Sequence, residues 1–268
     1  MNNPVNRFKA ALADGRPQVG LWSVLANAYT TEIVAGAGFD WLMLDAEHAP
    51  NDVSSILAQL QATQASPTSI VVRPAWNDTV LIKRYLDLGA QTLLIPYVQT
   101  AEEAARAVAA TRYPPDGVRG VGGSTVRATR FGRIGNYARE AAAQLCVLVQ
   151  IETRMGLDNL EAIAAVPGVD GVFIGPADLA ASLGHMGKAG HPEVRGAVDA
   201  AIGRLARCGK SAGLLMVDEP SAQRYFEMGA RFVAVGIDAV MLARASEALA
   251  GRFSGAPQSG DASRAFSY

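Results

Sequence analysis

The sequence predicts one α/β domain with the architecture of a (β/α)8 TIM barrel. It contains eight short apolar runs, several of them rich in β-branched residues, and each is followed by a longer stretch with helical spacing of apolar residues. Runs that are apolar throughout are typical of parallel strands covered by helices. A doubly wound open sheet is the alternative, but no Gly-x-Gly-x-x-Gly motif follows the first run, and eight units favour a closed barrel.

The predicted elements alternate along the chain. The predicted strands are Gln18–Trp22, Asp40–Asp45, Ser69–Arg73, Gln91–Pro96, Leu145–Glu152, Val169–Ile174, Ser211–Val217 and Arg231–Val235. The predicted helices are Ala28–Ala35, Val53–Gln61, Thr79–Leu88, Ala101–Ala110, Asn136–Ala143, Leu157–Val166, Val194–Ala206, Ser221–Met228 and Ala239–Leu249. Residues 1–253 are expected to form the barrel domain, and residues 254–268, which lack any periodicity, a flexible C-terminal tail.

Composition restricts the partners of the protein. The 24 basic and 25 acidic side chains nearly cancel, so no strong field draws the protein to nucleic acid or to anionic lipid. No apolar run approaches the roughly 20 residues that span a bilayer, and the N-terminus lacks the apolar core of a signal peptide. The two cysteines form no disulfide or metal motif, so we expect a cytoplasmic protein acting on small molecules.

Two carboxylates are predicted to meet at the C-terminal ends of neighbouring strands, where barrel enzymes place their reactive groups. Glu152 ends the fifth predicted strand and Asp178 follows the sixth. A pair of carboxylates suits Mg²⁺, Mn²⁺ or a similar divalent ion that keeps positions open for a substrate. The alternative is structural: Glu152 pairs with Arg154, and Asp178 caps the helix that follows it.

His48 and Arg73 are candidates for proton transfer and charge stabilisation. His48 lies just past the second strand, beside two acidic residues, and histidine exchanges protons near neutral pH; a purely structural histidine is the alternative. Arg73 ends the third strand and can present a planar fork to an oxyanion. Its alternative role is a salt bridge at the barrel mouth with Asp45 or Asp87.

Two further observations bear on the chemistry. The run Gly175-Pro176-Ala177-Asp178 can present backbone N–H groups to a carboxylate, although this signal is weak alone. A Schiff-base enzyme needs a buried lysine on a strand, and none of Lys9, Lys83, Lys188 and Lys210 has that context. The residues therefore favour a metal-assisted route to an enolate.

The motifs at these positions resemble a known family in their order along residues 5–253. Together they are similar to the class II, metal-dependent pyruvate aldolases of the 4-hydroxy-2-oxoheptanedioate aldolase and 2-dehydro-3-deoxyglucarate aldolase family. The motifs are Asp45-Ala46-Glu47-His48-Ala49-Pro50, Val72-Arg73-Pro74, Leu86-Asp87-Leu88-Gly89-Ala90-Gln91, Pro96-Tyr97-Val98-Gln99-Thr100, Arg119-Gly120-Val121-Gly122, Gln150-Ile151-Glu152-Thr153 and Gly175-Pro176-Ala177-Asp178-Leu179-Ala180.

The resemblance implies a reaction and a role for each site residue. It implies reversible cleavage of 4-hydroxy-2-oxo acids to pyruvate and an aldehyde, with Mg²⁺, Mn²⁺ or Co²⁺ as cofactor, in aromatic or sugar acid catabolism. The implied roles are metal binding by Glu152 and Asp178, contact with the enolate oxygen by Arg73, proton transfer by His48 supported by Asp45 and by Asp87, pyruvate binding by Gln150 and the backbone of Gly175, Pro176 and Ala177, and aldehyde contact by Leu215.

The resemblance also implies a homohexamer, and two rival functions stay open. A citramalyl- or malyl-CoA type lyase would use the same barrel but needs a basic surface for the CoA phosphates. Only the glycine- and arginine-rich segment between Arg119 and Arg133 offers one. A noncatalytic barrel that binds an oxo acid is the other rival, because a fold does not fix an activity.

Overall fold

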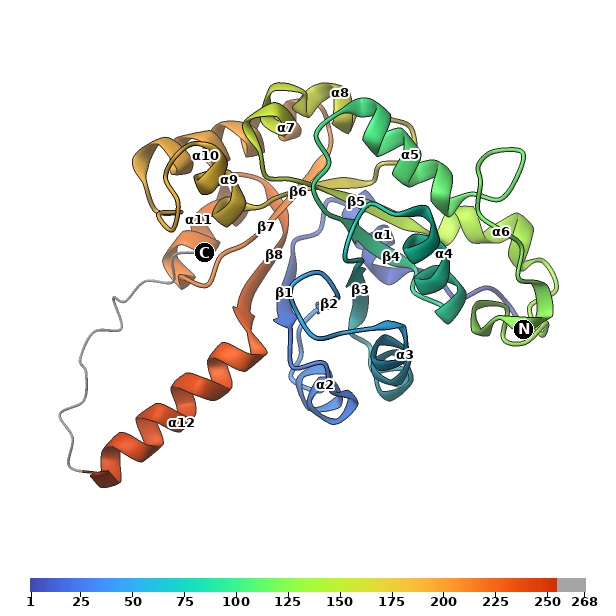
Figure 1. The fold of residues 1–268 in the computed structure, drawn as a ribbon, viewed down its shortest axis with the longest axis horizontal. Helices are drawn as coiled ribbons and strands as arrows, with labels where there is room; N and C mark the ends of the chain where they lie inside the picture. Colours follow the sequence, from blue (N-terminus) through green and yellow to red (C-terminus); the bar gives the residue numbers. More distant parts are fainter. Residues whose placement is uncertain (255–268) are drawn as a thin grey trace.

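A computed structural model describes residues 1–254, and it contains a closed barrel of eight parallel strands in sequential order (Figure 1). The strands are β1 (Gln18–Ser23), β2 (Trp41–Asp45), β3 (Ser69–Arg73), β4 (Thr92–Ile95), β5 (Cys146–Ile151), β6 (Gly171–Ile174), β7 (Ser211–Leu215) and β8 (Ala230–Ile237). Each corresponds to one predicted strand. The predicted (β/α)8 fold is confirmed.

Helices follow the strands and surround the barrel (Figure 1). They are α1 (Arg7–Ala13), α2 (Ala28–Ala35), α3 (Val53–Ala62), α4 (Thr79–Leu88), α5 (Ala101–Thr111), α6 (Tyr137–Gln144), α7 (Arg154–Asp158), α8 (Leu160–Ala164), α9 (Pro176–Ser182), α10 (Pro192–Arg207), α11 (Glu219–Glu227) and α12 (Asp238–Ser254), with short 3-10 turns η1 (Gly123–Thr125) and η2 (Arg127–Thr129). Within residues 1–254, no helix combines the length and apolarity needed to cross a bilayer.

Aromatic side chains fill the barrel interior near the N-terminal ends of the strands. Trp41 and Phe232 are fully buried, and Phe8 of α1 packs edge-on against both, with ring centroids 5.8 and 5.7 Å away. Room for Trp41 comes from Gly20, its register partner on β1, because a Cβ there would lie 2.1 Å from the indole ring. Helix α1 therefore closes the N-terminal end of the barrel.

Side-chain caps explain several acidic residues at the opposite, C-terminal end. Asp52, Asp78 and Asp218 each accept a hydrogen bond from a backbone N–H in the first turn of the helix they precede, which satisfies donors that the helix leaves free. These residues are fixed by structure.

The structure differs from the predicted elements in a few places. Helices α1 and α9 were not predicted, and the predicted helix Leu157–Val166 is divided into α7 and α8 at Asn159, whose side chain donates to Gln99 O at 2.9 Å. Helix α12 continues to Ser254, one residue past the predicted domain boundary, and extends away from the barrel (Figure 1). The rest of the predicted tail lies outside the described residues.

Candidate active site

A cavity of about 560 Å³ opens at the C-terminal ends of the strands. It is lined by polar residues from β2, β3, β5 and the start of α9 and by apolar residues such as Leu215. A larger cavity of about 790 Å³ lies at the N-terminal end, beside the starts of β3 and β4. No acidic side chain lines that larger cavity, so it offers no pair of carboxylates for metal or acid–base chemistry.

Arg73 is held in the cavity by a two-pronged ion pair with Asp45. The Nε of Arg73 donates to Asp45 Oδ1 at 2.9 Å, and Nη2 donates to Oδ2 at 2.6 Å. Burial acts to raise the pKa of Asp45, but hydrogen bonding and charge from Arg73 outweigh it and lower the pKa. Asp45 therefore stays ionised, so the predicted salt bridge exists and also positions the guanidinium inside the cavity.

Trp22 completes this support, and sequence reasoning missed it. Its indole N–H donates to Asp45 Oδ2 at 3.2 Å, and its ring lies 4.8 Å from the guanidinium carbon of Arg73. A cation over an indole face is attracted by the ring electrons. The signal was available, because Trp22 ends a strand just as Arg73 does.

Glu152 is buried at the end of β5, with only 3% of its surface exposed. Its Oε1 accepts from the backbone N–H of Tyr97 at 2.9 Å, and its Oε2 accepts from the side-chain amide of Gln150. Burial raises the pKa of Glu152 to about 7, and the negative charges of Asp178 and Glu47 add to the rise. The ionised carboxylate is therefore costly without a counter-charge.

The structural alternatives for this carboxylate pair do not hold. Arg154 contacts Glu193, 3.6 Å away, rather than Glu152. Asp178 lies in the first turn of α9, whose start has no side-chain cap. Gly175 leaves space for Glu152, because a Cβ there would lie 2.8 Å from Oε2.

Glu47 is a third acidic residue near Glu152 and Asp178, and the sequence predicted no role for it. Its Oε2 lies 2.9 Å from Arg73 Nη1 in an ion pair that lacks hydrogen-bond alignment, so this buried oxygen has no hydrogen-bond partner. Burial raises the pKa of Glu47 to about 7 although Arg73 opposes the rise, and Asp45 and Asp178 reinforce it. Asp45 and Glu47 thus pair with the Arg73 guanidinium, and Glu47, Glu152 and Asp178 lie close enough to raise the pKa of the two glutamates.

His48 lies at the rim of the cavity with 65% of its side chain exposed. The expected support from Asp45 reaches only its backbone, whose N–H lies 3.4 Å from Asp45 Oδ1. Both Asp45 side-chain oxygens bind Arg73 instead. The acidic side chain that approaches the His48 ring is Glu47, whose Oε2 lies 3.8 Å from Nε2.

The structure gathers most of the other candidates and separates one. Gln150, Gly175, Pro176, Ala177 and Leu215 line the cavity. Asp87 does not.

Asp87 lies near the C-terminal end of α4, and helices that follow barrel strands end at the opposite face of the barrel. There Asp87 accepts from the buried Arg119 at 2.9 Å, so it cannot support His48 within one chain. The arginine-rich segment 119–133 lies on the same far face: Arg127 donates to Leu88 O at 2.6 Å, next to the end of α4.

The donor chemistry of the cluster fits a hard divalent cation. Glu152 and Asp178 offer carboxylate oxygens, the ligands preferred by Mg²⁺ and Mn²⁺. Burial, reinforced by the negative charge of Asp178, raises the pKa values of Glu47 and Glu152. A bound cation would favour their ionised forms.

Comparison with known proteins gives a consistent family. Residues 18–245 match the family described as HpcH/HpaI aldolase/citrate lyase. A 4-hydroxy-2-oxo-heptane-1,7-dioate aldolase from Salmonella heidelberg (strain SL476) is 59% identical over 248 residues, covering 92% of this chain and 94% of that protein.

Two solved structures support the same relationship. An HpcH/HpaI aldolase/citrate lyase family protein from Burkholderia cenocepacia J2315 has a TM-score of 0.89 at 43% identity, covering 92% of this chain and 99% of that one. An HpcH/HpaI aldolase from Desulfitobacterium hafniense DCB-2 has a TM-score of 0.82 at 30% identity, with coverage of 91% and 95%.

Proposed function

The chain belongs to the HpcH/HpaI aldolase/citrate lyase family, and on that premise we propose that it is a divalent-metal-dependent aldolase. Its substrates are 4-hydroxy-2-oxo acids, which it cleaves reversibly between C3 and C4 into pyruvate and an aldehyde. The Salmonella relative is named for 4-hydroxy-2-oxo-heptane-1,7-dioate. That bond in the seven-carbon diacid divides it into pyruvate and succinic semialdehyde, which we take as the first aldehyde to test.

The close approach of Glu47, Glu152 and Asp178, beside an Arg73 that pairs with Asp45 and Glu47, is the observation that carries the proposal. We assign metal binding to Glu152 and Asp178, because Asp45 is committed to Arg73. When bound, Mg²⁺, Mn²⁺ or Co²⁺ supplies Lewis-acid polarisation of the substrate keto group. The raised pKa of Glu152 supports this assignment, because a cation would stabilise the ionised form.

Arg73 stabilises the oxygen charge that develops as the C3–C4 bond breaks. Its guanidinium is fixed by Asp45 before any substrate binds, so little reorganisation is needed during the reaction. Gln150 and the backbone at Gly175 to Ala177 face the pyruvate half, and Leu215 faces the aldehyde half.

His48 manages the proton of the C4 hydroxyl. In cleavage it accepts that proton through a water molecule, and in the aldol direction it returns it. Its exposed position at the rim suits a group that exchanges protons with solvent, and its Nε2 lies 3.8 Å from Glu47 Oε2.

The rival functions find less support. A CoA thioester lyase would need the arginine-rich segment 119–133 near the cavity, whereas Arg127 and Arg119 contact the far end of α4. A noncatalytic oxo-acid binder would not need a proton-transfer group at the rim. His48 at that position favours catalysis.

We extend the proposal to a cytoplasmic homohexamer. Helix α12 extends away from the barrel (Figure 1). It exposes Met241, Leu242, Leu249 and Phe253, and subunit contacts commonly cover apolar side chains of this kind. Both cysteines are free, which suits a reducing compartment.

The test is an aldol assay with pyruvate, a panel of aldehydes and Mg²⁺, Mn²⁺ or Co²⁺. We expect aldol product that disappears with a chelator and returns when metal is restored. Product formation that survives chelation, with inactivation by borohydride in the presence of pyruvate, would replace the metal route by a Schiff base. Cleavage of a malyl thioester without aldol activity would favour the lyase.

A further inference from the structure

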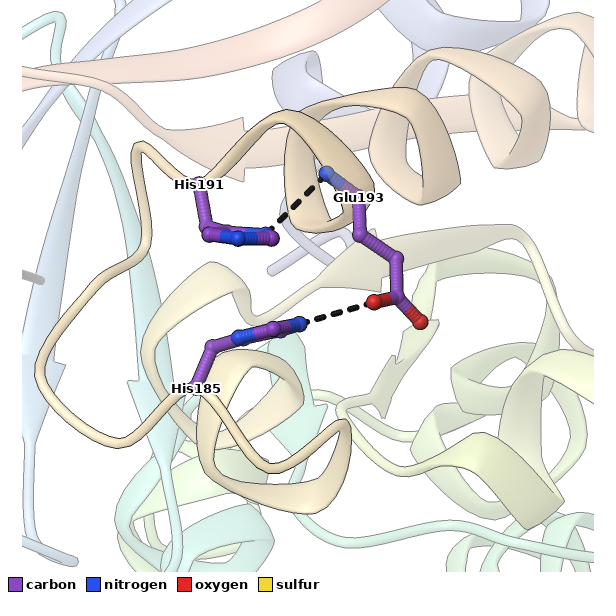
Figure 2. Close-up of side chains that lie close together, drawn as sticks. All are labelled: His185, His191 and Glu193. Atoms are coloured by element: carbon purple, nitrogen blue, oxygen red, sulfur yellow. Dashed lines mark hydrogen bonds and ion pairs between the residues drawn. The ribbon is translucent and has the colours of Figure 1, made fainter.

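A second group of metal-ligand side chains lies outside the cavity, at the segment that joins α9 to α10. It consists of His185, His191 and Glu193, whose ligand atoms all lie within 4.8 Å of one another (Figure 2). His185 Nε2 and Glu193 Oε2 are 2.8 Å apart. Within residues 1–254 no other trio of His, Cys, Asp or Glu side chains comes so close.

The backbone fixes the two histidines before any ligand binds. The N–H of His185 donates to Ala180 O at 2.7 Å, the N–H of Lys188 to His185 O at 2.9 Å, and the N–H of His191 to Lys188 O at 2.8 Å. Gly184 and Gly187 take the left-handed conformations that these turns require, with φ of 85° and 69°. The segment is therefore a closed pair of turns with a defined geometry.

The two histidine donor atoms make their hydrogen bonds within the trio itself. The two imidazole rings stack with centroids 3.6 Å apart, and Figure 2 shows both directed toward Glu193. His191 Nδ1 accepts one long hydrogen bond, 3.3 Å, from the backbone N–H of Glu193. Arg154 approaches Oε1 of Glu193 at 3.6 Å, which leaves Oε2 facing His185.

We propose that His185, His191 and Glu193 bind a divalent transition-metal ion, Zn²⁺ in the first place, with water completing the coordination. Each ring turns about its Cβ–Cγ bond so that the lone pairs of His185 Nε2 and His191 Nδ1 point to one centre. The bound ion replaces the contact between His185 and Glu193. Two imidazoles and one carboxylate suit Zn²⁺, Ni²⁺ or Co²⁺ and disfavour Mg²⁺, which prefers oxygen ligands.

This site is distinct in chemistry from the carboxylate cluster of the cavity. The proposed ligands in the cavity, Glu152 and Asp178, are both oxygen donors, whereas the second site offers two nitrogens. A zinc ion here would tie the loop after α9 to the start of α10, and Mg²⁺ at millimolar concentration would not compete for it.

The test counts zinc on the full-length protein. Chelator-treated protein is dialysed against Zn²⁺ with excess Mg²⁺, and bound zinc is measured per chain. We expect wild type to hold one zinc ion more than His185→Phe, which keeps a ring for stacking, and more than Glu193→Gln. Lys188→Ala, from the same loop, serves as the control and should match wild type.

Two further readouts separate binding from folding. Zn²⁺ should raise the melting temperature of wild type and of Lys188→Ala more than that of His185→Phe, because a ligand that binds the native state stabilises it. Aldol activity with Mg²⁺ should be unchanged in His185→Phe. Equal zinc counts and equal zinc-dependent shifts in wild type, His185→Phe and Glu193→Gln would overturn the proposal.

Discussion

Replacing Glu152 by glutamine should stabilise the metal-free protein at pH 8 while removing its response to metal. Glu152 is almost fully buried, and burial raises its pKa to about 7, with repulsion from Asp178 and Glu47 adding to the effect. Glutamine is neutral and keeps an oxygen for the backbone N–H of Tyr97. The substitution therefore removes a buried charge at little cost in volume.

The size of the effect follows from the pKa. A carboxyl whose pKa rises from 4.5 to about 7 costs about 3 kcal/mol more to ionise in the fold than in the unfolded chain. Because the folded pKa is the higher one, the metal-free protein loses stability as pH rises from 4.5 through 7. The NH₂ group of the new glutamine cannot accept the hydrogen bond that Gln150 donates to Glu152, which offsets part of this stabilisation. We therefore expect the free energy of unfolding at pH 8 to rise by about 1 to 3 kcal/mol.

Urea unfolding at fixed protein concentration, in a chelator at pH 5 and pH 8, measures this gain. Glu152→Gln should exceed wild type in stability at pH 8 and match it at pH 5. Adding Mn²⁺ at pH 8 should stabilise wild type alone. Glu32→Gln, on the exposed face of α2, is the control and should change neither value. A Glu152→Gln protein less stable than wild type at both pH values would refute the charge-based reasoning.

Three other substitutions probe the site and the barrel. Arg73→Lys keeps a charge but loses the fork to Asp45, so kcat should fall by about 10² to 10³ with KM for pyruvate less affected; a loss below tenfold in steady-state kinetics would contradict this. Gly175→Ala places a Cβ 2.8 Å from Glu152 Oε2 and should weaken Mn²⁺ binding by at least about tenfold in calorimetry, whereas unchanged affinity would show that the carboxylate tolerates the methyl group. Gly20→Ala overlaps Trp41 and should cost about 1 to 3 kcal/mol in urea unfolding; wild-type stability would mean that the indole moves freely.

The barrel could be predicted because its strands are apolar throughout. β2 and β5 are buried along their whole length, so their hydrophobic runs stand out against the polar helix surfaces. Short helices gave weaker signals: α1 has seven residues, including Arg7 and Lys9, and α9 has seven residues and begins inside a motif that was interpreted for its backbone N–H groups rather than as a helix of its own. Their positions depend on packing against the barrel, which local sequence does not encode.

The site was predictable where the strand-end rule applies. Arg73 and Glu152 were located by that rule: Arg73 lines the cavity, and Glu152 accepts a hydrogen bond from Gln150, which also lines it. Partnerships were harder to infer. Asp45 ends β2 just before His48 but binds Arg73 on the neighbouring strand β3, and Asp87 lies on the far face, because spacing along the chain does not say which side chains meet.

The buried aromatic rings beneath the cavity also bear on the order in which the two products leave the enzyme. Phe8, Trp41 and Phe232 fill the barrel beneath the cavity, so we expect reactants to enter and leave at the C-terminal ends of the strands. Glu152 is buried and His48 is exposed at the rim, so the proposed roles of these residues put the pyruvate fragment deeper than the aldehyde fragment. We therefore expect the aldehyde to leave first and pyruvate, leaving last, to compete with substrate for the free enzyme.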